Sequence, residues 1–134
     1  MRGFAVILVA VVALAAAASP VGASSAKTLV TVRLKEFKVI PAPVSAKRGV
    51  VVFSVRNTGK VAHELVVLKT KVAPGKLRVK RGRAILVGRV GGVRPMKPRA
   101  SRMLMLTLTA GKHVLLCNLP GHYQAGQRVG FAIS

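Results

Sequence analysis

The chain reads CNLPGHYQAGQ over residues 117–127. Cys117 closes an apolar run, and His122 follows it by five residues, across a Pro-Gly turn. Gln127 comes five residues after His122, just before the last apolar segment of the chain. A thiol, an imidazole and an amide therefore share one loop between two β-like segments, and these are groups that can hold a transition metal.

A second histidine lies far upstream of this loop. His63 follows the turn sequence NTG of residues 57–59 and begins a predicted strand. If His63 meets the loop of residues 117–127, one thiolate and two imidazoles form a soft, nearly trigonal ligand set, and a weak fourth group can approach from one side. This is the ligand chemistry of electron-transfer copper.

The sequence from residue 28 onward is typical of β-structure. Short segments rich in Val, Ile, Leu and Thr alternate with Gly, Pro and Asn, and no sustained helical period is present. The predicted strands cover residues 28–34, 50–56, 64–69, 84–90, 102–109, 112–117 and 128–133. About seven strands in roughly a hundred residues predict one all-β, two-sheet sandwich. Residues 72–100 are expected to form long basic loops around one or two short strands.

The N-terminal segment differs from the rest of the chain. A start with one positive charge precedes an apolar run over residues 5–18, and small residues follow up to Ala26. This order is typical of a secretory signal peptide. A retained membrane anchor is the alternative, but the run is shorter than the roughly 20 residues needed to cross a bilayer. We therefore expect a signal peptide over residues 1–23, with cleavage possible as late as Ala26, a domain over residues 27–134, and export to the periplasm, the cell surface or the medium.

The charge balance excludes several function classes. The chain has 23 Lys and Arg residues but two acidic residues, Glu36 and Glu64, for a net charge of +21. Without aspartate there is no carboxylate pair for glycoside hydrolysis, no Ser-His-Asp triad and no carboxylate cage for calcium or magnesium. Three histidines and Glu64 are few groups for acid–base catalysis. We expect the protein not to be an enzyme.

The same charge indicates the kind of partner. A strong positive field speeds encounters with anionic surfaces, such as an acidic redox protein, phospholipid headgroups or acidic wall polymers. Lys and Arg alone bind nucleic acid non-specifically. However, the chain has only Tyr123 and four Phe residues for base stacking, and export argues against a genomic role. We expect no specific nucleic-acid partner.

Cys117 is the only cysteine of the chain. A lone exposed thiol is a liability in an oxidising compartment, so three interpretations compete: a buried inert thiol, an intermolecular disulfide, or a metal thiolate. The histidine that follows in the same loop favours the metal thiolate.

These residues resemble the cupredoxins, the blue or type 1 copper proteins of the plastocyanin and azurin type. The resemblance rests on NTG at residues 57–59 with His63-Glu64, and on CNLPGH at residues 117–122 with Gly126. It covers essentially the whole predicted mature chain and implies a cupredoxin-like Greek-key β-sandwich. It further implies that His63, Cys117 and His122 bind one copper ion in a plane, and that the protein is a monomer that carries single electrons between redox partners.

The sequence departs from the commonest cupredoxin pattern at the axial position. Most members have methionine after the glycine, whereas this chain has Gln127 after Gly126. The amide oxygen of Gln127 is a plausible weak axial ligand, and the alternative is a surface residue beside a three-coordinate site. Because an amide oxygen is harder than a thioether, axial Gln127 is expected to favour Cu(II) and to lower the reduction potential.

Other residues near the motif have plainer interpretations. Asn118 and the backbone around residues 57–59 and Ala62 are candidates for hydrogen bonds to the sulfur or to His63. His113 shares a strand face with Cys117 but lies a strand length from the metal, so a structural role is expected.

Sulfur and aromatic side chains elsewhere are expected to pack or to face solvent. Met103 and Met105 alternate along one predicted strand with Leu104 and Leu106, and with Met96 they are interpreted as packing or surface residues. Tyr123 is expected to pack, and its place next to His122 would let it shield the loop. Glu64 is interpreted as a surface residue or as a neighbour of the site.

Four functions remain in competition at this point. The leading one is single-electron transfer by a type 1 copper centre. The main alternative is a copper store or chaperone on the same fold that transfers no electrons. A zinc site and a Cys-His nucleophilic enzyme are the others.

Overall fold

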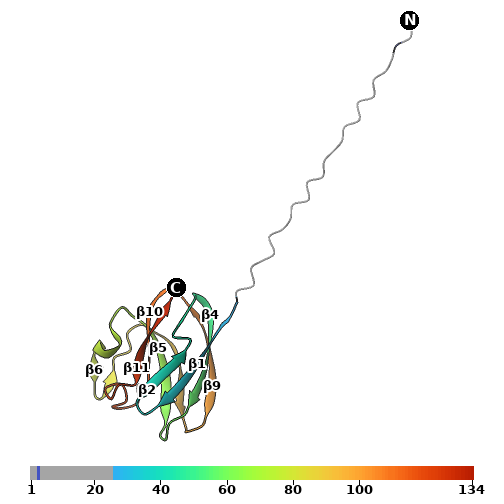
Figure 1. The fold of residues 1–134 in the computed structure, drawn as a ribbon. Helices are drawn as coiled ribbons and strands as arrows, with labels where there is room; N and C mark the ends of the chain where they lie inside the picture. The colour runs from blue at the N-terminus through green and yellow to red at the C-terminus, as the bar shows by residue number, and fades with distance from the viewer. Residues whose placement is uncertain (1–2, 4–25) are drawn as a thin grey trace.

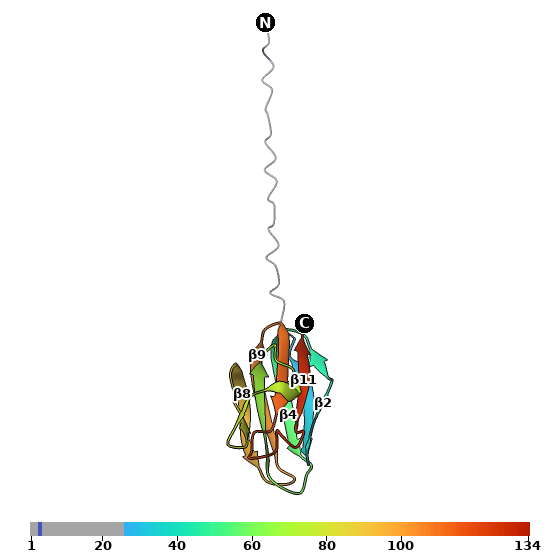
Figure 2. The same cartoon turned by 90° about the vertical axis from the view of Figure 1, so that its left-hand side faces the viewer.

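The computed structural model describes Gly3 and residues 26–134. The predicted signal peptide, residues 1–23, therefore lies outside the described residues except for Gly3. Within the described part of the chain, no helix is long and apolar enough to cross a membrane. The strands run roughly along the long axis of the domain (Figures 1 and 2).

One sheet of the sandwich has four strands in the order β2-β1-β4-β9. The bounds of these strands are Lys38–Ala42 for β2, Thr28–Lys35 for β1, Gly49–Asn57 for β4 and Ser101–Leu108 for β9. Strands β1 and β4 pair in parallel, while β1 with β2 and β4 with β9 pair antiparallel. The short turn between β1 and β2, residues 36–37, lies at the end of the sheet that will carry the site.

The second sheet has five strands in the order β3-β11-β10-β5-β8. Their bounds are Ser45–Ala46 for β3, Arg128–Ile133 for β11, Gly111–Leu116 for β10, His63–Lys69 for β5 and Arg89–Met96 for β8. Strand β8 is an edge strand, so Pro95, which has no N–H to donate, leaves the ladder intact. A 3-10 turn η1, Pro74–Lys76, and a small hairpin of β6, Val79–Lys80, and β7, Arg83–Ala84, lie between β5 and β8.

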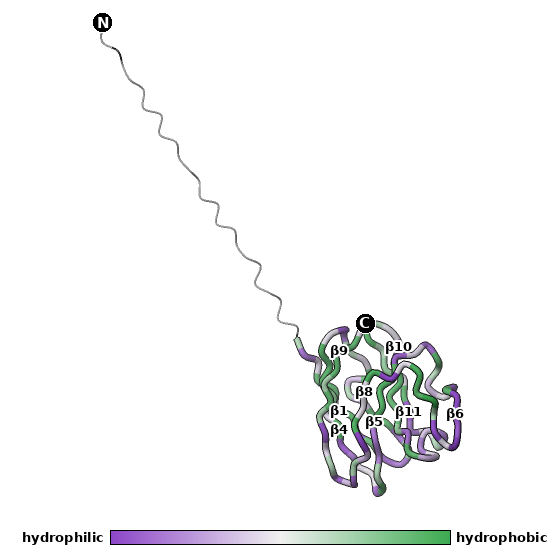
Figure 3. Tube along the Cα trace, turned by 180° about the vertical axis from the view of Figure 1, so that it is seen from behind, coloured by the Kyte–Doolittle hydropathy of each residue, from purple (hydrophilic) through white to green (hydrophobic). Residues whose placement is uncertain are grey.

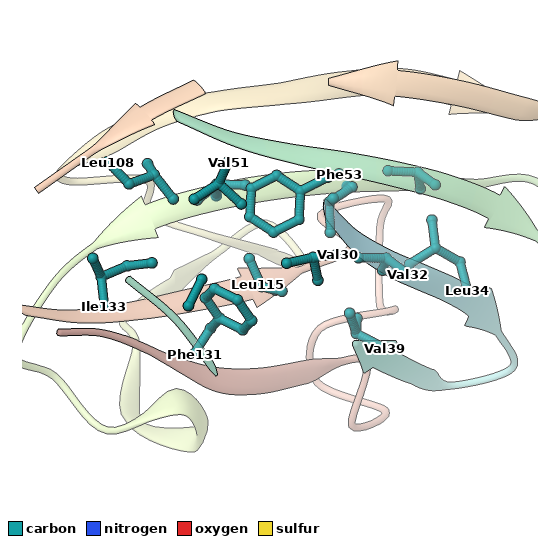
Figure 4. Close-up of a cluster of buried hydrophobic side chains, with 14 of the residues drawn as sticks. Val30, Val32, Leu34, Val39, Val51, Phe53, Leu108, Leu115, Phe131 and Ile133 are labelled. Atoms are coloured by element: carbon teal, nitrogen blue, oxygen red, sulfur yellow. The ribbon is translucent and has the colours of Figure 1, made fainter. Parts of the chain in front are cut away.

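The main core lies between the two sheets. Alternate side chains of the facing strands are buried there, as the period of two along a strand requires (Figure 4). Phe53 of β4 and Phe131 of β11 meet edge to face across the gap, with ring centroids 5.7 Å apart. The predicted alternation along β9 is confirmed, because Leu104 and Leu106 are partly buried while Met103 and Met105 on the other face are exposed.

The outer face of the second sheet is also covered. Val66, Leu68, Val114 and Leu116 pack there with Ala84 and Tyr123 in a second buried cluster. Because both faces of β5 and β10 are buried, these strands read as continuous apolar runs rather than as an alternation. The Tyr123 hydroxyl donates to Pro74 O at 2.6 Å and accepts from Leu77 N at 2.9 Å, so the segment of residues 74–77 is bound to the loop of residues 117–127.

The predicted all-β sandwich is confirmed, and six of the seven predicted strands coincide with observed ones within a residue or two. The strand predicted at residues 84–90 is wrong, because the chain leaves β7 at Ala84 and enters β8 at Arg89. Gly88 between them has φ +83° and passes so close to Lys69 O that a Cβ would overlap it. The short strands β2, β3 and β6 have no counterpart in the prediction.

His113 is buried in the core as a structural residue. Its Nδ1 lies 3.1 Å from Gly111 O, and among the described residues no group hydrogen-bonds to its Nε2. Burial lowers the pKa of His113 from its ordinary value of 6.5, with Lys69 acting in the same direction and the Gly111 bond opposing it. The folded protein therefore holds His113 neutral more strongly than the unfolded chain does.

This burial predicts a loss of stability in acid. Below about pH 6.5 the unfolded chain binds a proton at His113 more readily than the folded one, so the free energy of unfolding falls as the pH drops from 6.5 toward the folded pKa. Urea unfolding at pH 7.5 and at pH 5 measures this fall. His113→Gln is expected to reduce it without removing it, since burial also lowers the pKa of His63. An equal fall in the variant would contradict the assignment.

Candidate metal centre

The strand pairing brings the predicted ligands to one end of the sandwich. Strands β5 and β10 are antiparallel neighbours with Leu116 opposite Val66, so the start of β5 lies beside the end of β10. His63 is the first residue of β5, and Cys117 directly follows β10. The backbone N–H of Glu64, next to His63, donates to Cys117 Sγ at 3.4 Å. The loop between β10 and β11 then returns His122 and Gln127 to the same place.

Four donor atoms converge there. His122 Nδ1 lies 3.3 Å from His63 Nδ1, 3.4 Å from Cys117 Sγ and 3.1 Å from Gln127 Oε1. Within residues 26–134, His63, Cys117 and His122 are the one group of His, Cys, Asp or Glu side chains placed to share a metal ion, and their ligand atoms lie within 4.8 Å of one another. His63, Cys117 and Gln127 are fully buried and His122 is half-buried.

The donor set fits a soft or borderline transition metal. Two atoms bound at about 2.0–2.3 Å to a shared ion, at roughly 110° to each other, are about 3.3–3.8 Å apart. The distances of 3.3 and 3.4 Å from His122 Nδ1 to His63 and Cys117 come close to that separation. Two imidazole nitrogens, one sulfur and one amide oxygen are the ligand types of copper electron-transfer sites.

Burial sets the protonation of the cluster. It raises the pKa of the Cys117 thiol, although backbone hydrogen bonds from Glu64 and Leu119 oppose the rise. It also lowers the pKa of His63, so this imidazole is held neutral, as a metal ligand must be. A cation placed between these groups would favour the thiolate, because a bound metal deprotonates a coordinating thiol.

Gln127 is oriented by its own amide group. Its Nε2 donates to Lys35 O at 3.2 Å, with Lys38 O at 3.5 Å, on the chain that enters and leaves the β1–β2 turn. These carbonyls can accept only from the NH₂ end of the amide, so the Gln127 oxygen faces His122. The alternative of a surface glutamine is excluded by its complete burial.

Asn57 holds the loop that precedes His63. Its Nδ2 donates to Val61 O and Met96 O, each at 2.9 Å, and its Oδ1 accepts from Gly59 N at 2.9 Å. Among the described residues, the backbone of residues 57–59 and of Ala62 makes none of the predicted hydrogen bonds to the sulfur or to the His63 side chain, whose partners include Glu64 N, His122 and Glu36. Asn57 instead acts on the backbone of the loop through its side chain.

Asn118 does not have its predicted role at the sulfur. Its Oδ1 accepts from Ala84 N at 2.7 Å and its Nδ2 donates to Ala84 O at 3.0 Å. The amide of Asn118 therefore pairs with the edge of β7 as the backbone of a neighbouring strand would. Gly121 N also donates to Gly82 O at 2.8 Å, and the Arg83 guanidinium donates to Asn118 O at 2.9 Å. The β6–β7 hairpin thus lies directly against the loop that carries His122.

Two residues at the site were missed by the sequence analysis. Glu36, in the β1–β2 turn, places Oε1 3.1 Å from His63 Nε2. Phe37, beside it, packs edge to face on His122 with ring centroids 5.1 Å apart. The signal that could have identified Glu36 is its rarity, because it is one of two acidic residues in the chain.

The remaining candidates lie where they were expected. Met103 and Met105 are on the exposed face of β9, 64% and 58% accessible, and Met96 is buried at the end of β8. Tyr123 is buried against the segment that begins at Pro74. These positions match packing and surface roles.

Together the two-sheet arrangement and the His-Cys-His cluster define a cupredoxin-type sandwich with a candidate metal centre. Auracyanin from the photosynthetic bacterium Roseiflexus castenholzii is 17% identical, with 84% of this chain and 99% of that chain covered and a TM-score of 0.57. Auracyanin B is 19% identical, with 85% and 93% covered and a TM-score of 0.64. Rusticyanin from Thiobacillus ferrooxidans is 18% identical, with 81% and 77% covered and a TM-score of 0.64.

Auracyanin and rusticyanin are cupredoxins, and the predicted cupredoxin-like fold is confirmed. No protein-family model matches the sequence, and no curated protein matches it. At these identities the similarity establishes the fold, whereas the function has to be argued from the site.

Proposed function

We propose that this chain is a type 1 copper protein that carries single electrons. The observation that supports this most directly is the convergence of His63 Nδ1, Cys117 Sγ and His122 Nδ1 at one end of a cupredoxin fold. Copper, when bound, supplies a one-electron couple between Cu(II) and Cu(I). The protein is proposed to be a carrier rather than an enzyme.

The chain's own residues serve this function in distinct ways. Cys117 and His63 are fully buried at the ends of paired strands, so the sandwich fixes their positions and excludes water. His122 is half-buried and lies in the loop, which makes it the ligand nearest to solvent and the natural route for an electron. Phe37 packs against its ring and limits its motion.

An absorption spectrum of the purified protein with one equivalent of Cu(II) tests the proposal. A type 1 site gives an intense blue band from thiolate-to-copper charge transfer. A copper store or chaperone on the same fold, which is the alternative function, binds the metal without this band. A zinc site or a Cys-His hydrolase also gives no such colour, so a colourless copper-loaded protein would overturn the proposal.

Gln127 is proposed as the axial ligand, through Oε1. Its burial and the hydrogen bonds of its Nε2 to Lys35 O and Lys38 O support this role, because they orient the oxygen toward His122.

Gln127→Met is expected to raise the reduction potential. A thioether is softer than an amide oxygen and favours Cu(I) more. Potentiometry on both copper-loaded proteins measures the shift, and Gln124→Met, an exposed position in the same loop, is the matched control. No rise in the Gln127 variant would argue against axial ligation.

Export is proposed from the N-terminal sequence. The pattern of residues 1–26 indicates a signal peptide, and the periplasm, the cell surface or the medium are the destinations it allows. N-terminal sequencing of protein recovered outside the cytoplasm tests this, and a start near residue 24 or 27 is expected.

The partner is proposed to be an acidic redox protein that docks beside His122, with this chain as a monomer. The β6–β7 hairpin bonds to the metal loop and carries the exposed cations Arg78, Lys80 and Arg81. The residues around β6 are strongly hydrophilic (Figure 3). Cations at this position would steer an anionic partner toward the solvent-facing ligand, and added salt would slow the encounter.

Charge reversal at the hairpin is expected to slow electron transfer to an anion. Arg78→Glu with Lys80→Glu should lower the rate of oxidation by hexacyanoferrate(III) about 10-fold at low ionic strength, with the difference vanishing in high salt. Lys47→Glu with Arg48→Glu changes the net charge equally at the opposite end of the sandwich, near Ser134, and should change the rate little. Equal effects of the two pairs would contradict docking at the hairpin.

A further inference from the structure

Glu36 stands out among the residues that touch the metal-binding cluster. It contributes no ligand atom to the cluster, yet its Oε1 lies 3.1 Å from His63 Nε2, on the side of the ring away from Nδ1. Glu36 is separated from His63 by 27 residues and reaches it from the β1–β2 turn of the other sheet. In a chain with a net charge of +21, a negative charge is thus placed directly behind a metal-binding imidazole.

We propose that Glu36 is a positioning residue that fixes the Nε2–H tautomer of His63 and places a carboxylate beside the copper site. A carboxylate accepts hydrogen bonds, so its contact with Nε2 requires that nitrogen to carry the proton. The lone pair of Nδ1 then faces Cys117 and His122. This inference rests on the proposed copper site for its redox consequence, whereas the tautomer is a property of the metal-free protein.

The carboxylate is itself held in place. Oε1 also accepts from Lys60 N at 2.7 Å and from Val61 N at 2.8 Å, and these bonds come from the loop that leads into His63. The Val61 bond is the largest of the causes that lower the pKa of Glu36 to about 2. Glu36 therefore ties the β1–β2 turn to both the backbone and the side chain of the His63 region.

Gly59 shows how closely this contact is fitted. A Cβ on Gly59 would lie 2.6 and 2.8 Å from the two carboxylate oxygens of Glu36 and 2.8 Å from His63 Nε2. These distances are too short for carbon, so a side chain at this position would displace either Glu36 or the His63 ring. The glycine of the NTG turn thus leaves the space in which carboxylate and imidazole meet.

The contact has two chemical consequences. A carboxylate hydrogen-bonded to a metal-ligating imidazole orients the ring and raises its basicity, and loss of such a partner typically lowers metal affinity about 10–100-fold. A negative charge near the ion also favours Cu(II) over Cu(I) by electrostatics, and so lowers the reduction potential.

Three variants test the proposal. Glu36→Gln keeps an oxygen that can accept from Nε2 but removes the charge, while Glu36→Ala removes both. Glu64→Gln is the matched control, because it removes the other acidic side chain of the chain, next to His63, without changing the Glu36 contact. Thermal unfolding of each metal-free variant verifies that it is folded.

Nitrogen-15 NMR of the metal-free protein reports the His63 tautomer without any copper chemistry. Wild type, Glu36→Gln and Glu64→Gln are expected to hold the Nε2–H form, and Glu36→Ala is expected to show a mixture. In the same series Cu(II) affinity should fall about 10–100-fold in Glu36→Ala. The reduction potential should rise more in Glu36→Gln than in Glu64→Gln.

An unchanged tautomer and an unchanged Cu(II) affinity in folded Glu36→Ala would overturn the proposal. So would equal potential shifts in Glu36→Gln and Glu64→Gln, since they would reduce the role of Glu36 to unspecific charge. A wild-type protein that binds Cu(II) without a blue band would instead refute the proposed function, while the tautomer measurement would still decide the role of Glu36.

Discussion

Cys117→Ser is expected to abolish the intense visible absorption of the copper-loaded protein. The band requires charge transfer from a thiolate, and the chain contains no second cysteine to replace it. Serine offers a hard oxygen that is not deprotonated at neutral pH, so Cu(II) affinity should fall by more than the roughly 10–100-fold seen when an outer partner of a ligand is lost. Optical and paramagnetic resonance titrations with Cu(II) measure both effects.

Met105→Leu is the control for this experiment. It removes the sulfur of a methionine that is 58% exposed on β9, in the sheet that does not contain β5 or β10, and should leave the spectrum unchanged. Cys117 is fully buried, and serine places a more polar hydroxyl there, so thermal unfolding of metal-free Cys117→Ser verifies that the variant is folded. A Cys117→Ser protein that stays blue would show that the sulfur is not a ligand, and the proposed function would fail with it.

The four residues of the cluster were predictable because their positions are local to strand ends. Cys117 and His122 share one loop, and the apolar runs around them identify the strands that the loop joins. His63 begins a strand, and antiparallel pairing of that strand with the one ending at Leu116 is enough to bring the two regions together. Gln127 was predictable because it lies in the same loop as Cys117 and His122, directly before the last strand.

Glu36 was not predictable in the same way. Its contact with His63 depends on how the β1–β2 turn of one sheet lies over the end of the other, and no sequence period encodes that distance. Asn118 illustrates a related failure. Its two hydrogen bonds to Ala84 exist only because the segment of residues 70–88 folds back over the outer face of the second sheet.

The strand errors have a physical reason too. Residues 84–90 have strand-like composition, but Gly88 needs a positive φ and a close backbone approach to Lys69, and this splits the segment into the end of β7 and the start of β8. The two-residue strand β3 is stabilised by pairing with the distant strand β11, and β6 by the short hairpin that it forms with β7, so neither has a sequence pattern of its own.

Asn57→Ala is expected to lower the free energy of unfolding by about 3 kcal/mol. The side chain is fully buried and makes three hydrogen bonds, to Val61 O, Met96 O and Gly59 N. Alanine removes these three hydrogen bonds, one of them buried and two part-buried, and each contributes about 1 kcal/mol. Urea unfolding of the metal-free protein measures the loss.

Thr31→Ala is the matched control, because it removes one exposed side-chain hydrogen bond, to Ala42 O, and should cost no more than about 0.5 kcal/mol. The Asn57 variant should also bind Cu(II) more weakly, since Val61 is held two residues before His63 and a loosened loop no longer orients the imidazole. A stability loss as small as that of Thr31→Ala would mean that solvent replaces Asn57 at no cost. The loop before His63 would then be fixed by its other hydrogen bonds, from Lys60 N and Val61 N to Glu36 and from Thr58 N to Leu34 O.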